Sequence, residues 1–169
     1  MNNTIGEIVT KTINSLPVEI TEGEAKLFNS FPIEEVVPVL RTLVQDELTD
    51  PIIASRSFDA LLKLDALDKV DFLIDLFDNS NQEWRLVCCQ NLSKFNDSRA
   101  VEKLCNIVLH DPSPDIRFCA AESLSIIGGP AAIAVLEKVK DSDTGIDYEG
   151  FKIADMAAKA IEKIRTRYE

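Results

Sequence analysis

The apolar residues of this chain recur with a step of 31 or 32 residues. Within each copy they follow the three- and four-residue spacing of an amphipathic helix, and the copies share one register. The four matched sets are Leu61, Leu92 and Leu124; Leu64, Phe95 and Ile127; Val70, Val101 and Ile133; and Leu73, Leu104 and Leu136. Agreement over four positions indicates a structural repeat, in which each copy buries its apolar face against its neighbours.

Helix-starting residues keep the same step. First helices are predicted to begin at Asp50-Pro51, Asn81-Gln82 and Ser113-Pro114, and second helices at Asp97-Ser98 and Gly129-Pro130. Side chains of Asp, Asn and Ser accept hydrogen bonds from the unpaired N–H groups of a first turn, and proline fits the first helical position. Each copy is therefore predicted to be a helical hairpin, with a first helix of roughly 14 residues and a second of roughly 11.

Weaker copies flank these three. A capping box at Thr21 and Glu24 precedes one, and a further first helix begins near Ile153 after a longer step of 37 residues. A leading helix carries Ile5, Ile8, Val9, Thr12, Ile13 and Leu16 on one face. We expect one all-α domain over 1–169 with about ten helices and no strand. It would comprise an N-terminal capping helix in 1–20, repeats at 21–49, 50–80, 81–112 and 113–142, and a C-terminal capping helix in 150–169.

The segment "DPSPDIRFCAAESLSIIGGPAAIAVLEKVKD" (111–141) resembles a short HEAT repeat of the phycobilisome lyase type. The family pattern is D-x-x-x-x-V-R-x-x-A-A-x-x-L-x-x-I-G-x-P-x-A-I-x-x-L. Residues 78–108 are similar but have Trp84 at the Val position and Asp97 at the second Gly, and residues 50–77 have Ala54 in place of the Arg. The resemblance implies a right-handed α-solenoid of stacked helical hairpins, with the second helices lining a concave side. It implies little about function, since this repeat serves many unrelated roles.

Charge excludes some function classes. The chain has 18 basic and 29 acidic residues and a formal net charge of −11. Residues 1–50 hold 3 basic and 9 acidic side chains, 51–110 hold 7 and 9, and 111–169 hold 8 and 11, so none of the three segments is basic. Binding to nucleic acid or to an anionic membrane needs cations, so we expect neither. The N-terminus lacks the apolar core of a signal peptide and no run could span a membrane, so a cytoplasmic protein is expected.

Residues capable of catalysis do not form a recognisable set. Four cysteines without C-x-x-C spacing and a single histidine, His110, cannot supply a zinc site. Cys88 and Cys89 occupy positions where another copy has alanines, so small size explains them. The resemblance implies a structural role for Arg85 and Arg117, in which each arginine ties one repeat unit to the next through hydrogen bonds to a turn. No catalytic residue, metal or cofactor is expected, and the protein is predicted not to be an enzyme.

The loop "DSDTGIDYEG" (141–150) has the alternating acids of a calcium site. Gly145 and Lys152 stand where that motif needs oxygen ligands, so the calcium reading fails. Two readings stay open, a solvated loop and a recognition loop.

The exposed stripe of the second helices is the predicted binding surface. Its candidate residues are Glu35, Asp68, Asp71, Asp75, Arg99, Glu102, Asn106 and Lys138, with Phe72 and Phe77 adding apolar area beside the acids. An acidic groove of this kind suits a partner protein with a basic surface. We therefore predict a monomeric protein–protein interaction module or scaffold that binds on its acidic concave face, one version being an inhibitor or immunity-type protein. The alternatives are an ordinary solvated helix face and, from the resemblance, a phycobilin lyase-like or chromophore-protein accessory factor.

Overall fold

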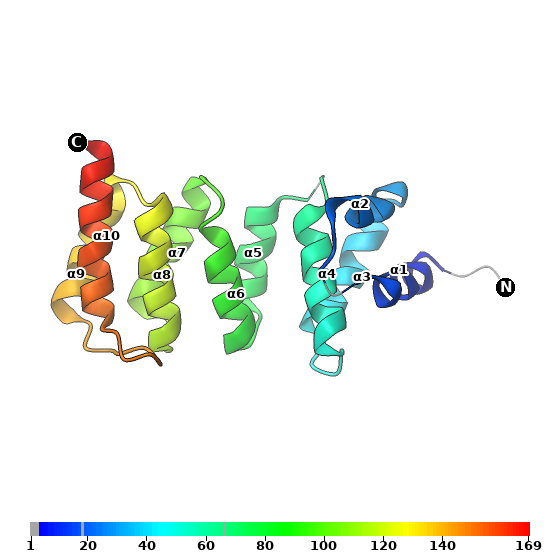
Figure 1. Ribbon diagram of the computed structural model, residues 1–169, viewed down its shortest axis with the longest axis horizontal. Coiled ribbons are helices and arrows are strands. Elements are labelled where there is room, and N and C mark those ends of the chain that lie inside the picture. Colours follow the sequence, from blue (N-terminus) through cyan, green and yellow to red (C-terminus); the bar gives the residue numbers. More distant parts are fainter. Residues whose placement is uncertain (1–3, 18, 66) are drawn as a thin grey trace. The chain divides into compact units, whose positions relative to one another are not determined.

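The computed structural model describes residues 4–17, 19–65 and 67–169, and its regular elements are helices (Figure 1). The bounds are α1 (Ile5–Ser15), α2 (Glu22–Ala25), the 3-10 helix η1 (Lys26–Ser30), α3 (Ile33–Gln45), α4 (Pro51–Lys63), α5 (Lys69–Asp78), α6 (Gln82–Leu92), α7 (Ser98–His110), α8 (Pro114–Ile127), α9 (Pro130–Ser142) and α10 (Ile153–Tyr168). Within the described ranges the only β pairing is an isolated bridge between Ile146 and Lys152. The all-α prediction is confirmed.

The chain divides into two compact units, Met1–Lys69 and Val70–Glu169. The division falls at the first residue of α5, inside the predicted repeat 50–80. Each unit is therefore described by itself. The predicted single domain and its repeat boundaries stay a prediction.

In the first unit, α1, α3 and α4 pack together. Their buried faces meet in an apolar core that includes Val9, Ile13, Leu40 and Leu61. The predicted capping box is present: the Thr21 hydroxyl accepts the N–H of Glu24 at 3.3 Å, and the Glu24 carboxylate accepts the N–H of Thr21 at 2.8 Å. The helix that it starts is short, because α2 gives way to η1 after one turn.

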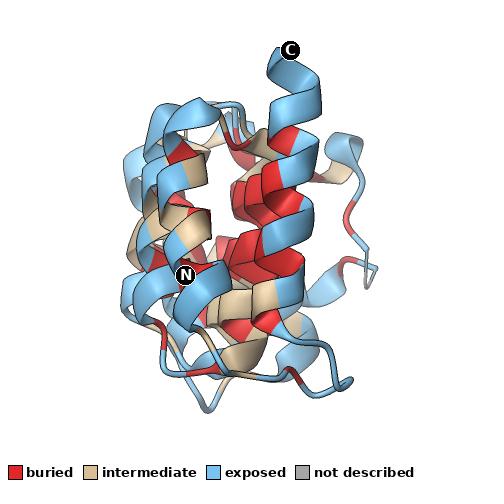
Figure 2. Cartoon of the chain, turned by 90° about the vertical axis from the view of Figure 1, so that its left-hand side faces the viewer, coloured by how far each residue is buried: buried red, intermediate tan, exposed pale blue. Residues whose placement is uncertain are grey.

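The second unit has two rows of helices, α6, α8 and α10 in one row and α5, α7 and α9 in the other (Figure 1). Contacts run along the rows, from α6 to α8 to α10, and across them, from α7 to α8 and from α9 to α10. Leu92, Leu104, Leu124 and Leu136, which the repeat register aligns, are fully buried. In Figure 2 the buried residues of these helices gather on their inner sides and the exposed ones on their outer sides.

The predicted cap residues stand at the N-caps of their helices. Side chains of Asp50, Asn81 and Asp97 accept backbone N–H groups of the first turn. Ser113 and Gly129 hold the N-cap positions of α8 and α9 without a side-chain cap bond, and a proline follows each. Local capping chemistry therefore sets the helix starts, and the apolar rows set which faces pack.

Leu92→Ala and Leu124→Ala should each lower the free energy of unfolding by about 2–5 kcal/mol, because each removes a fully buried side chain and leaves a cavity. Ile126→Ala, on the exposed side of the same helix as Leu124, should cost less than about 0.5 kcal/mol. Urea denaturation followed by circular dichroism measures all three. Losses as small as the control's at both leucines would contradict the repeat register.

Candidate functional site

Arg85 and Arg117 hold equivalent positions in α6 and α8, and each pairs with an aspartate that follows the second helix of its own hairpin. The Arg85 Nε donates to Asp111 Oδ2 at 3.2 Å. The Arg117 Nε and Nη2 donate to the two carboxylate oxygens of Asp143 at 2.7 and 3.1 Å. The Arg117 Nη1 also donates to the carbonyl oxygen of Asp111 at 2.9 Å. Both guanidinium groups therefore join helices and turns, as predicted for a structural role.

The same aspartates organise the turns that they occupy. The Asp111 carboxylate accepts the N–H of Ser113 at 2.9 Å, and the Asp143 carboxylate accepts the N–H of Gly145 at 2.7 Å. The hydrogen bonds from Arg117 hold the pKa of the Asp143 carboxyl below its ordinary value. A Cβ on Gly145 would lie 2.5 Å from the Arg117 Nη2 and 2.9 Å from the Asp143 Oδ1, so a larger residue there would displace the paired side chains.

Three of the predicted carboxylates lie in the second unit, on neighbouring helices of one row. Asp71 and Glu102 are exposed and Asp75 is half-buried. Asp71 and Asp75 are four residues apart on α5 and so share one side of that helix. We name Asp71, Asp75 and Glu102 the α5–α7 acidic surface.

The other predicted site residues are placed as follows. Asn106 and Arg99 are exposed on α7, and Arg99 pairs with the cap residue Asp97 at 2.8 Å. Lys138 is exposed on α9. Glu35 and Asp68 are exposed residues of the first unit, so they are not counted in the α5–α7 acidic surface.

The prediction that Phe72 and Phe77 add apolar area to this surface is wrong. Phe72 is 1% exposed and Phe77 is 7% exposed, because α5 buries a wide apolar face that includes both rings. Neither side chain is available to a partner, and the surface is polar.

Lys103 is a residue that the sequence reasoning missed. Its Nζ donates to Asp78 Oδ1 at 2.5 Å and lies 4.9 Å from the centre of the Phe77 ring, so it joins α7 to α5. Its side chain is largely buried. The repeat register is consistent with the burial of Lys103, because Lys103 aligns with Phe72 and Val135, neither of which is exposed.

The thiols and the histidine differ in burial. Cys88, Cys89 and Cys119 are buried, Cys105 is half-buried, and burial raises the pKa of Cys88 to about 12. His110 is the last residue of α7 and is exposed. Among the described residues, no group of three or more His, Cys, Asp or Glu side chains is placed to hold a metal ion.

The loop between α9 and α10 is held by hydrogen bonds of its own. The buried Asp147 carboxylate accepts the N–H groups of Glu149 at 3.1 Å and of Phe151 at 2.8 Å. The Tyr148 N–H donates to Asp115 of α8 at 2.8 Å. Gly150 has a φ of +92°, which a residue with a side chain rarely adopts.

This ordered loop exposes large apolar side chains. The exposed residues are Ile146, Phe151 and Tyr148. Tyr148 is the most exposed of the three, at 80%. Phe151 stacks on Phe118 of α8 with ring centres 6.2 Å apart. The loop acids therefore serve to order the backbone, and the aromatic residues form its outer surface.

The family model of HEAT repeats matches residues 70–148, from α5 to the loop after α9. This match covers just under half of the chain and supports a HEAT-repeat family. With the stacked hairpins of the second unit it confirms the predicted fold class, an all-α solenoid. The match is to HEAT repeats in general, so the resemblance to the phycobilisome lyase type stays a prediction. Comparison with curated proteins finds no match.

In the part of the chain that the structure describes, no helix combines the length and the apolar character needed to cross a membrane.

Asp143→Asn should destabilise the protein by about 1–3 kcal/mol at pH 7, because it removes a charged partner of Arg117. The lowered pKa makes this contribution present above the ordinary carboxyl value near 4 and lost as the pH falls through the folded-state value. The difference between the variant and the wild type should therefore shrink below about pH 4, as thermal unfolding at several pH values will show.

Asp141→Asn is the matched control, since Asp141 is an exposed acid at the end of the same helix. It should change stability by less than about 0.5 kcal/mol at every pH. A difference between Asp143→Asn and the wild type that stays constant down to pH 3 would contradict the assigned role of the pair.

Proposed function

We propose that this protein is a non-enzymatic interaction module whose second unit binds a partner protein with a basic surface. HEAT repeats generally serve as protein-interaction modules, and the match lies in the second unit. The proposal adds to that general role the face and the chemistry of the partner. An inhibitor or immunity-type protein, which blocks the activity of a basic partner, is one form of this function.

The observation that carries the proposal is the concentration of carboxylates on α5. Three aspartates, Asp71, Asp75 and Asp78, follow one another at steps of four and three residues, so they share one side of the helix. Glu102 adds a fourth carboxylate from α7. Lys103 pairs with Asp78 at the end of this series.

An acidic helix face of this kind acts mainly on the rate of association. Carboxylates at the surface attract a cationic protein before contact, and screening by salt weakens the attraction over about 8 Å at physiological ionic strength. The contacts are polar because the nearby rings are buried. We therefore expect an association rate that falls as salt is added.

The double variant Asp71→Lys and Glu102→Lys should slow association with the partner about tenfold and flatten its salt dependence. The partner is first isolated on the immobilised full chain from host extract and identified by mass spectrometry. Association rates of the purified pair are then measured by surface plasmon resonance at several salt concentrations. Loss of the partner's own activity in the complex would identify the inhibitor form.

Glu83→Lys and Glu122→Lys together make the same charge change on exposed residues of α6 and α8. This control pair should change the association rate less than about twofold, and both doubles should unfold as the wild type does. If the control pair slows association and the Asp71 and Glu102 pair does not, the acidic surface is the wrong face.

A further inference from the structure

Positive charge in this acidic chain is concentrated at α10 and the residues just before it. Residues 151–169 contain five Lys or Arg and three Asp or Glu, a formal charge of +2, whereas residues 1–150 contain 13 and 26, a formal charge of −13. Residues 111–169 as a whole hold 8 basic and 11 acidic side chains, because residues 111–150 contribute eight acids. Residues 151–169 therefore form a short basic segment in an otherwise acidic chain.

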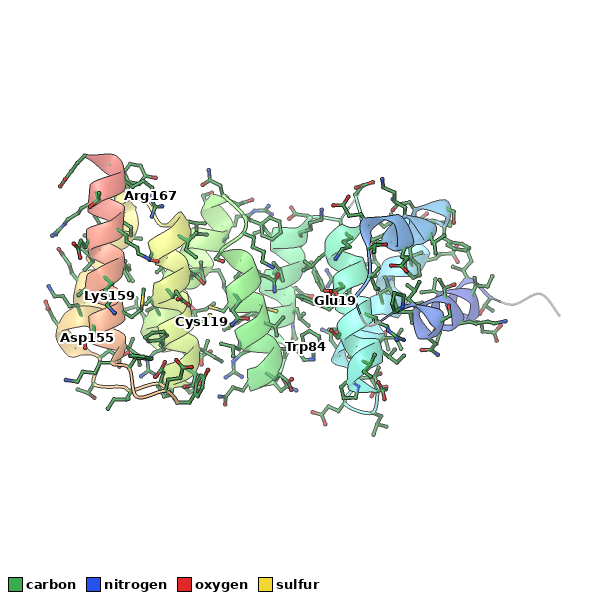
Figure 3. The ribbon with its side chains drawn as sticks, in the orientation of Figure 1. Glu19, Trp84, Cys119, Asp155, Lys159 and Arg167 are labelled. Atoms are coloured by element: carbon green, nitrogen blue, oxygen red, sulfur yellow. The ribbon has the colours of Figure 1, made fainter. Side chains whose placement is uncertain are left out.

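Three of these cations are not used by the fold. Lys152, Lys159 and Lys163 are exposed, and none forms an ion pair with another described residue. Lys159 and Lys163 are four residues apart and so share one side of α10, and Lys152 is the N-cap residue just before the helix. Figure 3 shows Asp155 near the end of α10 that adjoins the loop and Lys159 further along the same helix.

The two arginines of α10 differ from the lysines in this respect. Arg165 pairs with Glu137 of α9 at 2.9 Å, and Arg167 donates to the carbonyl oxygens of Ser125, Ile126 and Gly128 at the end of α8. Figure 3 shows Arg167 at the opposite end of α10 from Asp155. The arginines hold α10 on the stack, which leaves the lysines as the cations open to a partner.

The first two lysines line a small groove that has both apolar and charged walls. Phe118 of α8, Phe151 of the loop and Met156 of α10 line it together with Lys152, Asp155 and Lys159, and its volume is about 170 Å³. Pockets for small molecules usually measure about 300 Å³ or more, so this one suits a single side chain of a protein segment. The stacked Phe118 and Phe151 rings give its wall a fixed aromatic surface.

We propose that this α8–α10 groove binds an acidic, apolar segment of a partner protein. One apolar side chain of the segment packs against Phe118 and Phe151, and its flanking carboxylates bind Lys152 and Lys159. The bonds that order the loop hold Phe151 in place before binding, so little conformational entropy is lost on association. An exposed aromatic side chain in a rigid setting is a common anchor of protein interfaces.

Charge favours a peptide over a nucleic acid as the occupant. Asp155 lies between the two lysines, and Asp115 and Glu149 lie beside the loop, so a continuous phosphate backbone would meet carboxylates. A peptide can place its carboxylates only where the lysines are. The charge of −13 on the rest of the chain also opposes a polyanion.

Selection of a phage-displayed random dodecapeptide library on the immobilised full chain tests the proposal. Peptides that join Phe, Leu or Trp to Asp or Glu should be enriched, and a labelled copy of the strongest should bind in fluorescence anisotropy. Lys152→Glu and Lys159→Glu together should weaken its affinity at least about tenfold, since both cations become anions. Lys11→Glu and Lys26→Glu, an equal charge change on exposed residues of the first unit, should weaken it less than about twofold.

Three results would overturn the proposal. One is a selection that yields no peptide, or only peptides whose binding ignores the Lys152 and Lys159 change. Another is an equal loss in both double variants, which would show a general charge effect. The third is tighter binding of a labelled oligouridylate 15-mer, abolished by the Lys152 and Lys159 change, which would make the site one for nucleic acid.

This inference rests on the proposed protein-binding function but concerns a different row of helices. The Asp71 and Glu102 variants change the acidic surface, and the Lys152 and Lys159 variants change the groove. Each pair serves as a further control for the other, so either proposal can fail while the other stands.

Discussion

The pairing of an arginine in the first helix of a hairpin with an aspartate after its second helix is the contact on which the stacked unit depends. Asp111 shows why, since its carboxylate accepts from Arg85 while its backbone carbonyl accepts from Arg117 of the next hairpin. Asp111 therefore contacts both its own hairpin, through Arg85, and the next hairpin, through Arg117. The contacts run in the order Arg85, Asp111, Arg117 and Asp143, so they join the two hairpins of the second unit in series.

The copy at 50–80 lacks both members of this pair. Ala54 stands at the arginine position and Asn79 at the aspartate position, so no guanidinium can close this hairpin in the same way. The Asn79 amide instead donates to the carbonyl oxygen of Asp75, four residues earlier, at 2.8 Å. The boundary between the two compact units falls in this copy.

The repeat register could predict the helices, their caps and the leucine rows because each of these depends on residues close in sequence. Leu92 and Leu124 are buried as expected, and Asp97 and Asn81 cap as expected. The candidate surface was harder, because a helix packed on two sides buries more than one stripe. The sequence pattern predicts Phe72 beside the surface acids, but the packing of α5 buries it, and its equivalents Lys103 and Val135 are not exposed either. The contact of Lys103 with Asp78 depends on how two helices pack, which periodicity alone does not give.

The loop before α10 was the least predictable part, since it has no equivalent in the other copies. Its acids resemble metal ligands in sequence, but in the structure Asp143 binds Arg117 and Asp147 binds backbone N–H groups. The pair of Arg117 and Asp143 therefore also holds the start of the loop, and Phe151 at the end of this loop lines the groove. A loop fixed at one end by the repeat contact and at the other by α10 can change its exposed side chains without changing the stack. Recognition can then vary at Tyr148 and Phe151 while Arg117 and Asp143 keep the hairpins in register.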